Sequence, residues 1–269
     1  MVDRQAHQAS REPGTDSRVT LQAALHGKRA LVTGASSGLG AYFARTLSLS
    51  GAEVILTSRR RSQLEAVAEQ IRSSGGHAQM LELDVGSSAS LSEAARLWGR
   101  LDILINNAGV TNSKPLFEQT EADWDSILDT NLKGAWLVAM EVARTMKAGG
   151  SGGSIINVAS ILGLRQAGQV TPYAVSKAGI VQLTKQLGLE LARFNIRVNA
   201  LAPGYFATEL NKEFFASDAG TALIKRIPQR RLGSPDDLAG PLLLLASDAS
   251  RYMTGAVLAV DGGHLLSSL

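Results

Sequence analysis

A glycine-rich turn near the amino terminus constrains this chain more than any other stretch. Residues Lys28 to Gly40 read KRALVTGASSGLG, and they join a short apolar run to a helical pattern over Ala41–Leu49. In a strand, glycine turn and helix of this kind, Gly34 allows the sharp turn, Gly38 lets backbone approach a phosphate, and Gly40 lets helix pack against strand. The N–H groups that open the helix then face the anion. The stretch therefore predicts an opening βα unit that binds the phosphates of a dinucleotide.

The alternation of strand and helix patterns continues to the end of the chain. Strands are expected over Ala30–Val32, Glu53–Thr57, Gln79–Leu83, Asp102–Ile105, Ser154–Val158, Arg197–Leu201 and Ala256–Val260. Because a helical pattern separates each neighbouring pair, the strands are expected to be parallel, with right-handed crossovers. The predicted fold is α/β, a doubly wound, Rossmann-type parallel sheet of about seven strands in a single domain.

Two helix assignments within this pattern are specific enough to test. Thr120 with Asp123 is expected to cap one long helix that reaches Met146, with Asn131 in its middle, where asparagine is a poor choice. Ser62 with Glu65 is expected to form a capping box for the helix after the second strand.

Residues 27–269 are expected to form the dinucleotide-binding and catalytic domain. A chain of 269 residues fits one α/β domain with a large core. Residues 1–26 are polar and show no sustained period, so they are expected to be a flexible N-terminal arm. An oligomer contact is the alternative interpretation of this segment.

Charge and composition narrow the possible partners. The 27 Lys+Arg against 24 Asp+Glu leave +3 without a long basic block, so no nucleic-acid partner is expected. There is no cysteine and the four histidines are far apart, so no metal site is expected. The apolar run Leu242–Leu245 is much shorter than the about 20 residues of a membrane span. Because residues 1–26 lack the apolar core of a secretory signal, the expected location is cytoplasmic.

Tyr173, Lys177 and Ser160 are the candidates for chemistry. Tyr173 and Lys177 are four residues apart in a predicted helix and therefore share one face. A nearby positive charge lowers a phenol pKa from ~10 by roughly 1 to 3 units, into the range useful for proton transfer. Ser160 follows a predicted strand, at the sheet edge where ligands bind. A surface tyrosine and lysine, and a serine that caps a turn, are the ordinary alternatives.

Several separated motifs, found in one order, make the chain from Lys28 to Gly263 resemble the NAD(P)(H)-dependent short-chain dehydrogenase/reductase family. These motifs are Thr33-Gly34-x-x-x-Gly38-x-Gly40, Asp84-Val85, Asn106-Asn107-Ala108-Gly109, mid-helix Asn131, Ser160, Tyr173-x-x-x-Lys177 and Pro203-Gly204. Their combination is far more specific than any one of them.

The resemblance implies four catalytic residues, Asn131, Ser160, Tyr173 and Lys177. Tyr173 would donate a proton to a carbonyl oxygen, or accept one in reverse, as hydride moves to or from the nicotinamide. Ser160 would hydrogen-bond the same oxygen. Lys177 would lower the pKa of Tyr173 and bind the nicotinamide ribose. Asn131 would interrupt its helix and hold a water that connects Lys177 to solvent.

The resemblance also assigns cofactor contacts. Asp84 would meet the adenine amine, Asn107 the adenosine side and Thr208 the carboxamide. The complete set of expected cofactor-binding residues is Gly34, Ser36, Ser37, Gly38, Leu39, Gly40, Ser58, Arg59, Arg60, Asp84, Val85, Asn107, Ala108, Gly109, Tyr173, Lys177, Pro203, Gly204 and Thr208.

The end of the second strand favours NADP(H) over NAD(H). Family members that prefer NAD usually place an aspartate there, whereas this chain has Ser58 followed by Arg59. A guanidinium suits the 2′-phosphate of NADP. Arg60 is either a second clamp or a solvated side chain, and Ser37 stands where some NADP-preferring relatives carry a basic residue.

The expected function is that of an NADP(H)-dependent carbonyl reductase or alcohol dehydrogenase, which interconverts a small ketone and a secondary alcohol. The family resemblance implies a homotetramer assembled through the helices at Thr120 and Pro172. The aromatic stretch Tyr205–Phe215 is expected to be either a mobile lid over the substrate or ordinary subunit packing.

Three alternatives stay open. Reduction of 3-oxoacyl-carrier-protein uses the same motif set, although such enzymes often continue with Ile-Thr-Arg where Val110-Thr111-Asn112 stands here. Sugar or polyol oxidation is the second alternative. The third is an NADP-binding sensor or scaffold without turnover.

Overall fold

The computed structural model describes residues 25–207 and 212–266. Within them the strands form one sheet in the order β3-β2-β1-β4-β5-β6-β7, and all neighbouring strands are parallel. The strands are β1 (Arg29–Thr33), β2 (Glu53–Ser58), β3 (Ala78–Glu82), β4 (Ile103–Asn106), β5 (Gly153–Val158), β6 (Ile196–Pro203) and β7 (Val257–Val260). The prediction of a doubly wound parallel sheet is confirmed.

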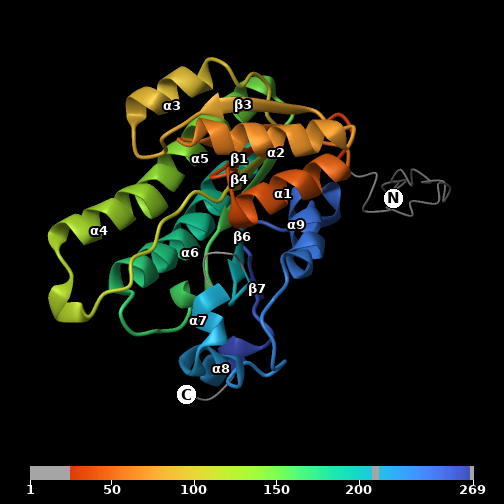
Figure 1. Ribbon diagram of the computed structural model, residues 1–269. Coiled ribbons are helices and arrows are strands. Elements are labelled where there is room, and N and C mark those ends of the chain that lie inside the picture. Colours follow the sequence, from red (N-terminus) through yellow and green to blue (C-terminus); the bar gives the residue numbers. More distant parts are fainter. Residues whose placement is uncertain (1–24, 208–211, 267–269) are drawn as a thin grey trace, which may run out of the picture.

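Helices cover both faces of the sheet (Figure 1). One face carries α1 (Gly38–Leu49), α2 (Arg61–Ser73) and α9 (Ala239–Ala246), and the other carries α3 (Ser88–Ala95), α5 (Ala135–Gly149) and α6 (Thr171–Leu191). The remaining α-helices of the described residues are α4 (Glu121–Leu128), α7 (Lys212–Ala216) and α8 (Asp218–Ile224).

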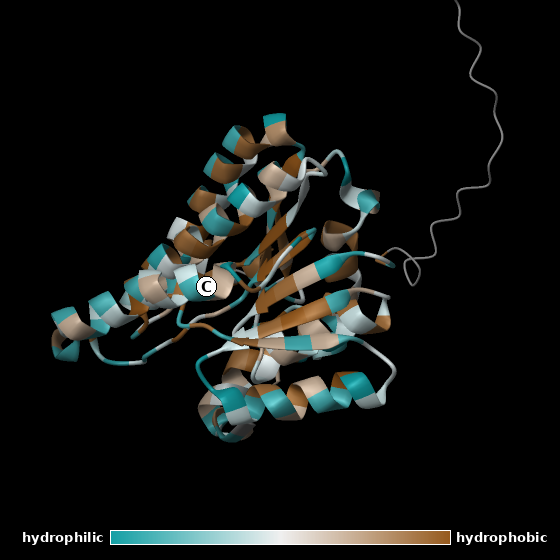
Figure 2. Ribbon diagram, turned by 90° about the horizontal axis from the view of Figure 1, so that it is seen from above, coloured by the Kyte–Doolittle hydropathy of each residue, from teal (hydrophilic) through white to brown (hydrophobic). Residues whose placement is uncertain are grey.

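In most strands, alternate residues enter different hydrophobic clusters on the two faces of the sheet. In β1, Val32 joins the cluster that contains Phe43 of α1, whereas its neighbour Leu31 joins the cluster that contains Val138 of α5. Figure 2 shows the hydrophobic strands enclosed between the helices. Both faces are buried, which explains why the strands read as continuous apolar runs in the sequence.

The hydrophobic core includes a residue that precedes residue 27. Leu25 is fully buried in the same cluster as Phe43, and its carbonyl accepts a hydrogen bond from the Lys28 amide at 3.0 Å. Burying a side chain of this size stabilises a fold by about 1.5–3 kcal/mol. Leu25 therefore packs into the core of the domain, although the expected arm included this residue.

The long helix expected from Thr120 to Met146 is not regular. Thr120 and Asp123 form the expected capping box at the start of α4. The chain then passes through a π-helical segment, Asp129–Gly134, which contains Asn131, before it continues as α5. The wider turn accommodates the buried Asn131 side chain, which bonds to a neighbouring loop.

The prediction of a capping box formed by Ser62 and Glu65 is wrong. Helix α2 begins two residues earlier than a Ser62 cap implies, at Arg61, with Arg60 at the N-cap and no side-chain capping bond. The Arg60 amide instead donates to the hydroxyl of Ser58, the last residue of β2, at 3.0 Å. This bond closes the turn between β2 and α2.

Neither a membrane-spanning helix nor a metal-binding group is found in the part of the chain that the structure describes. None of its helices is both long enough and apolar enough to cross a bilayer. None of its histidine, aspartate and glutamate side chains gather as a metal-binding group.

Candidate active site

The carboxyl ends of β1 and β4 form the crevice where this sheet is expected to bind a ligand. The chain leaves β1 toward β2 and β3 and then returns to the other side of β1 as β4, so the strand order reverses between these two strands. Ligands bind at such a switch point. The Thr33 hydroxyl accepts hydrogen bonds from the amides of Asn107 and Ala108, both at 2.9 Å, and the Asn107 side chain donates to the Thr33 carbonyl at 3.0 Å. These bonds fix the two strand ends against each other.

Each glycine of the first turn is required, or leaves space, for a different steric reason. Gly34 has φ +65°, and a Cβ there would lie 2.9 Å from the Ala108 Cα. A Cβ on Gly40 would lie 2.2 Å from the Gly34 carbonyl oxygen, so only glycine lets α1 approach the strand. At Gly38, with φ +55°, nothing lies within 4 Å of a Cβ, so the turn is open above this residue.

The start of α1 is arranged to receive an anion. The N-cap Ser37 makes no side-chain capping bond, and the first turn contains no acidic residue. The first N–H groups and the positive end of the helix dipole therefore remain available to a phosphate. Together with the open turn at Gly38, this arrangement fits a dinucleotide.

Arg60, more than Arg59, is held against this turn. The Arg60 guanidinium donates to the hydroxyls of Ser36 at 2.8 Å and Ser37 at 2.7 Å, and the Ser58 hydroxyl donates to Ser36 at 3.0 Å. Arg59 lies 3.9 Å from the Asp84 carboxylate, and its side chain is 66% exposed. The structure thus places both cations at the end of β2, with Arg60 directly over the glycine-rich loop.

The other predicted cofactor residues follow further strand ends. Asp84 comes after β3, where its carboxylate accepts from the Gly86 amide at 3.0 Å, and the next residue, Val85, is buried. Pro203 ends β6, and the Gly204 amide donates to the Val260 carbonyl at 2.9 Å. Leu39 packs on the core beneath α1. Thr208 lies outside the described residues.

Ser160, Tyr173 and Lys177 converge at the end of β5. Ser160 opens the 3₁₀ turn Ile161–Gly163, and its hydroxyl accepts from the Leu162 amide at 3.1 Å. This hydroxyl also hydrogen-bonds the phenol of Tyr173, in the first turn of α6. One turn later, the Lys177 ammonium lies 5.6 Å from the centroid of the Tyr173 ring and donates to the Val158 carbonyl at 2.7 Å.

Asn131 joins this group to the loop after β4. Its side-chain oxygen accepts from the Val110 amide at 2.7 Å, and its side-chain nitrogen donates to the Val110 carbonyl at 2.8 Å and to the Ser176 hydroxyl at 3.1 Å. Ser176 in turn donates to the Tyr173 carbonyl at 2.7 Å. A Cβ on Gly109 would lie 3.2 Å from the Asn131 side-chain oxygen, so the loop passes directly beside it.

Ser176 and Thr33 are site residues that the sequence did not assign a role. Thr33 stands in the glycine motif, but nothing in the motif shows that its hydroxyl would serve two amides of another strand. A serine between Tyr173 and Lys177 is equally unremarkable in sequence, and its complete burial is what distinguishes it.

The electrostatics of the site differ from the expectation in one respect. Burial raises the pKa of Tyr173, and Tyr205 adds to this effect, while the hydrogen bond with Ser160 acts in the opposite direction. Burial also lowers the pKa of Lys177 to about 8. The pKa of Tyr173 is thus raised overall and not lowered as expected, because the cost of burying a phenolate dominates. At neutral pH the phenol is protonated and can donate.

The aromatic stretch after β6 packs within the chain. The Tyr205 ring lies 6.0 Å from the ring of Phe215 in α7 and 5.5 Å from the ring of His264, measured between centroids. Phe215 is buried, whereas Phe214 is half-exposed. Residues 208–211 of this stretch lie outside the described residues.

Known proteins resemble this chain over nearly its whole length. A family model described as enoyl-(acyl carrier protein) reductase matches residues 34–264. The 2-dehydro-3-deoxy-D-gluconate 5-dehydrogenase of Escherichia coli K12 is 37% identical over 246 residues, which cover 90% of this chain and 96% of that protein. The 3-oxoacyl-[acyl-carrier-protein] reductase of Thermotoga maritima is 38% identical over 246 residues, covering 90% and 99%.

The fold matches a solved structure equally well. The gluconate 5-dehydrogenase of Burkholderia cenocepacia J2315, in complex with NADP and tartrate, superposes with a TM-score of 0.86 at 37% identity, covering 92% of this chain and 99% of that one. The family match includes the glycine turn and the residues around Tyr173. On these grounds the chain belongs to the short-chain dehydrogenase/reductase family of oxidoreductases.

Proposed function

We propose that this protein is an NADP(H)-dependent oxidoreductase that interconverts a ketone and a secondary alcohol. The observation that carries the proposal is the convergence of Ser160, Tyr173 and Lys177 at the sheet edge that also holds the open glycine turn. NADPH bound there would supply the hydride for reduction, and NADP⁺ would accept it in the reverse direction.

Each catalytic side chain has a role in reduction that its surroundings support. The protonated phenol of Tyr173 donates its proton to the substrate oxygen as a C–H bond forms at the carbonyl carbon. Ser160 donates a hydrogen bond to the same oxygen and stabilises its developing charge. The Lys177 ammonium then stabilises the phenolate that remains. Asn131 keeps Val110 and α6 at a fixed separation through its bonds on both sides.

The preference for NADP(H) is supported by the two guanidiniums at the end of β2. Arg60 lies over the hydroxyls of Ser36 and Ser37, and Arg59 lies beside it in sequence. A phosphate between such donors gains charge-assisted hydrogen bonds that a ribose hydroxyl cannot match. The related Burkholderia enzyme was solved with NADP, which agrees with this assignment.

Relatives suggest two substrate classes. Gluconate dehydrogenases and the D-threitol dehydrogenase of Mycolicibacterium smegmatis act on sugar acids and polyols, and other relatives reduce 3-oxoacyl chains. A panel of 5-ketogluconate, a polyol ketone and an acetoacetyl thioester, followed at the nicotinamide absorbance, tests the proposal. Turnover on any member supports an oxidoreductase. NADPH binding with no turnover on any member supports the sensor alternative.

Reduction should slow above pH about 8, because Lys177 then loses the charge that stabilises the phenolate. The pKa of Tyr173 is raised, so the phenol itself keeps its proton through this range. The measurement is kcat/KM for the ketone against pH. In Lys177→Arg the side chain stays charged, and the decline should move to higher pH even if the rate is lower. A decline that stays at the same pH in this variant contradicts the assignment.

The proposal includes a homotetramer and a cytoplasmic location. Large apolar side chains on α4, α5 and α6 are exposed, among them Trp124 at 42%, Trp136 at 45% and Leu189 at 76%. Light scattering should give a mass four times the 28.4 kDa of one chain, and Trp136→Glu should shift the mass toward smaller species. A single-chain mass for the wild-type protein contradicts the assembly.

A further inference from the structure

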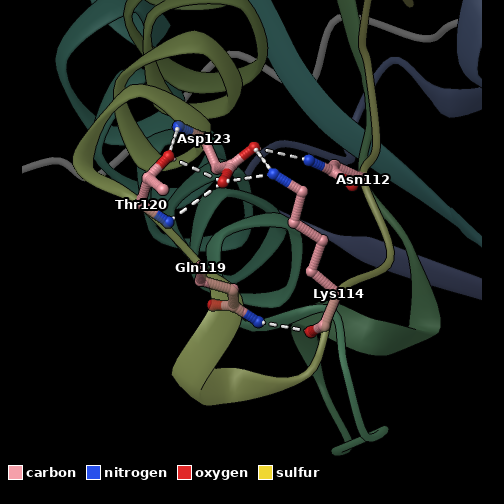
Figure 3. A network of polar contacts seen from close by, with 5 residues as sticks. All are labelled: Asn112, Lys114, Gln119, Thr120 and Asp123. Carbon is pink, nitrogen blue, oxygen red and sulfur yellow. Dashed lines mark hydrogen bonds and ion pairs between the residues drawn. The ribbon is translucent and has the colours of Figure 1, made fainter.

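A single carboxylate, that of Asp123, accepts hydrogen bonds from several donors in the loop between β4 and α4. Figure 3 shows the group, named here the Asp123 clamp, which consists of Asn112, Lys114, Gln119, Thr120 and Asp123. One oxygen of Asp123 accepts from the Asn112 side chain at 2.7 Å and from the Lys114 ammonium at 2.8 Å. The other accepts from the Lys114 ammonium at 2.7 Å, and from the Thr120 hydroxyl at 2.7 Å and amide at 3.0 Å. Gln119 completes the group by donating to the Lys114 carbonyl at 2.9 Å.

The clamp contains more contacts than a helix cap needs. The capping box at the start of α4 requires only Thr120 and Asp123. Asn112 and Lys114 are additional donors from the preceding loop. The hydrogen bond from Lys114, followed by those from the Thr120 hydroxyl and amide, lowers the pKa of Asp123 to about 2. The carboxylate is therefore charged at every pH at which the enzyme is expected to work.

The loop held by the clamp also contacts the segment that leads into the catalytic helix. The Lys114 amide donates to the Gln169 carbonyl at 2.9 Å, and the Ser113 hydroxyl donates to the Gln169 side-chain oxygen at 3.4 Å. Gln169 has φ +67° and stands two residues before the start of α6. Tyr173 lies in the first turn of that helix. Lys114 thus connects α4 to the approach of the catalytic phenol.

The same loop is fixed at its other end by Asn131. Val110 bonds to the Asn131 side chain through both its amide and its carbonyl. Residues 110–114 are therefore held by Asn131 at their beginning, and by Asp123 and Gln169 at their end. If the contact with Asp123 is lost, the Asn131 contacts remain, and the end of the loop nearest Gln169 keeps its bonds to Gln169 but loses its connection to α4.

We propose that the Asp123 clamp positions residues 110–114, the loop that leaves the active site at Gly109, against the catalytic helix, with Lys114 and Asp123 as positioning residues. This inference rests on the proposed function. The clamp holds residues 110–114 at a fixed distance from the first turn of α6. Substrate binding then requires little further ordering of either segment. Releasing the clamp should weaken substrate binding while leaving the cofactor turn at Gly34–Gly40 intact.

Two variants separate this positioning role from the helix cap. Lys114→Met removes the ammonium and keeps a side chain of similar length, and it leaves Thr120 and Asp123 in place. It should raise the KM for the ketone about tenfold with little change in the KM for NADPH or in Tm. Thr120→Val removes the capping hydroxyl and leaves Lys114 on Asp123. It should lower Tm by roughly 2–4 °C with little change in either KM. Lys114→Arg should restore most of the ketone affinity.

Hydrogen exchange tests the clamp without any turnover. In Lys114→Met, exchange should accelerate in the peptides that cover residues 110–115 and 165–175, and it should remain at the wild-type rate there in Thr120→Val. If the wild-type enzyme reduces no ketone, the proposed function fails while this measurement still decides on the clamp. Unchanged exchange and unchanged ketone KM in Lys114→Met would overturn the inference. The inference would also be overturned if Lys114→Met and Thr120→Val changed the ketone KM, the Tm and the exchange rates in the same way. Asp123 and its donors would then act only as a cap for α4.

Discussion

Tyr173→Phe should still bind NADPH and reduce ketones about 10²- to 10⁴-fold more slowly than the wild-type protein. Removing one hydroxyl takes away the proton donor but leaves the ring on α6, beside Lys177. The glycine turn and the arginines at the end of β2 are untouched, so NADPH should still bind. The two quantities to measure are the Kd for NADPH, by fluorescence titration, and kcat for the best ketone.

A matched control for this variant is Tyr252→Phe. Tyr252 is fully exposed, and its hydroxyl can be removed without disturbing any contact of the site. This control should keep the wild-type rate. If Tyr173→Phe also keeps it, Tyr173 is not the proton donor and the mechanism proposed here is wrong.

Arg60→Ala should reverse much of the preference for NADPH over NADH. Hydrogen bonds to a charged group contribute about 1.5–3 kcal/mol, so kcat/KM with NADPH should fall roughly 10- to 100-fold. The value with NADH should change little, because the adenosine ribose of NADH carries no phosphate. Arg59→Ala should shift the preference in the same direction by a smaller factor, because its guanidinium lies near Asp84 rather than on the glycine-rich loop.

Arg61→Ala is the control for this pair. Arg61 continues the same cationic run but begins α2 and is exposed. Its removal should leave the ratio of the two kcat/KM values as in the wild type. A ratio that also stays constant in both Arg59→Ala and Arg60→Ala would refute the assignment of the 2′-phosphate site.

The fold could be predicted from sequence because its signals are local and mutually consistent. Runs such as Val54–Thr57 are buried on both faces, and glycines end helices where the chain must turn. The strand ends then follow from the topology, so Thr33, Asn107 and Ser160 could be placed at one edge before any coordinates. The resemblance implied that Asn131 interrupts its helix, but the π-helical form of this interruption could not be predicted, since it reflects contacts between Asn131 and a loop 21 residues earlier.

The details of the site depend on directions and burial that a sequence does not contain. Arg59 and Arg60 are neighbours in the chain, and only the hydroxyls of Ser36 and Ser37 show which guanidinium lies on the turn. The direction of the Tyr173 pKa was predicted wrongly because proximity to Lys177 can be inferred from spacing, whereas burial cannot. Likewise, the capping box at Thr120 could be predicted from the sequence, but the two further hydrogen bonds that Asn112 and Lys114 donate to Asp123 could not.

The most direct test of the proposed chemistry is to follow the transferred hydrogen. NADPH deuterated at C4 of the nicotinamide, on the face that is transferred, is incubated with the enzyme and a ketone from the panel, and the alcohol is analysed by mass spectrometry and NMR. The account predicts one deuterium on the carbinol carbon with the wild-type enzyme, and almost none in the same time with Tyr173→Phe. Tight binding of the labelled NADPH with no deuterium in any product, for every ketone tried, would contradict it.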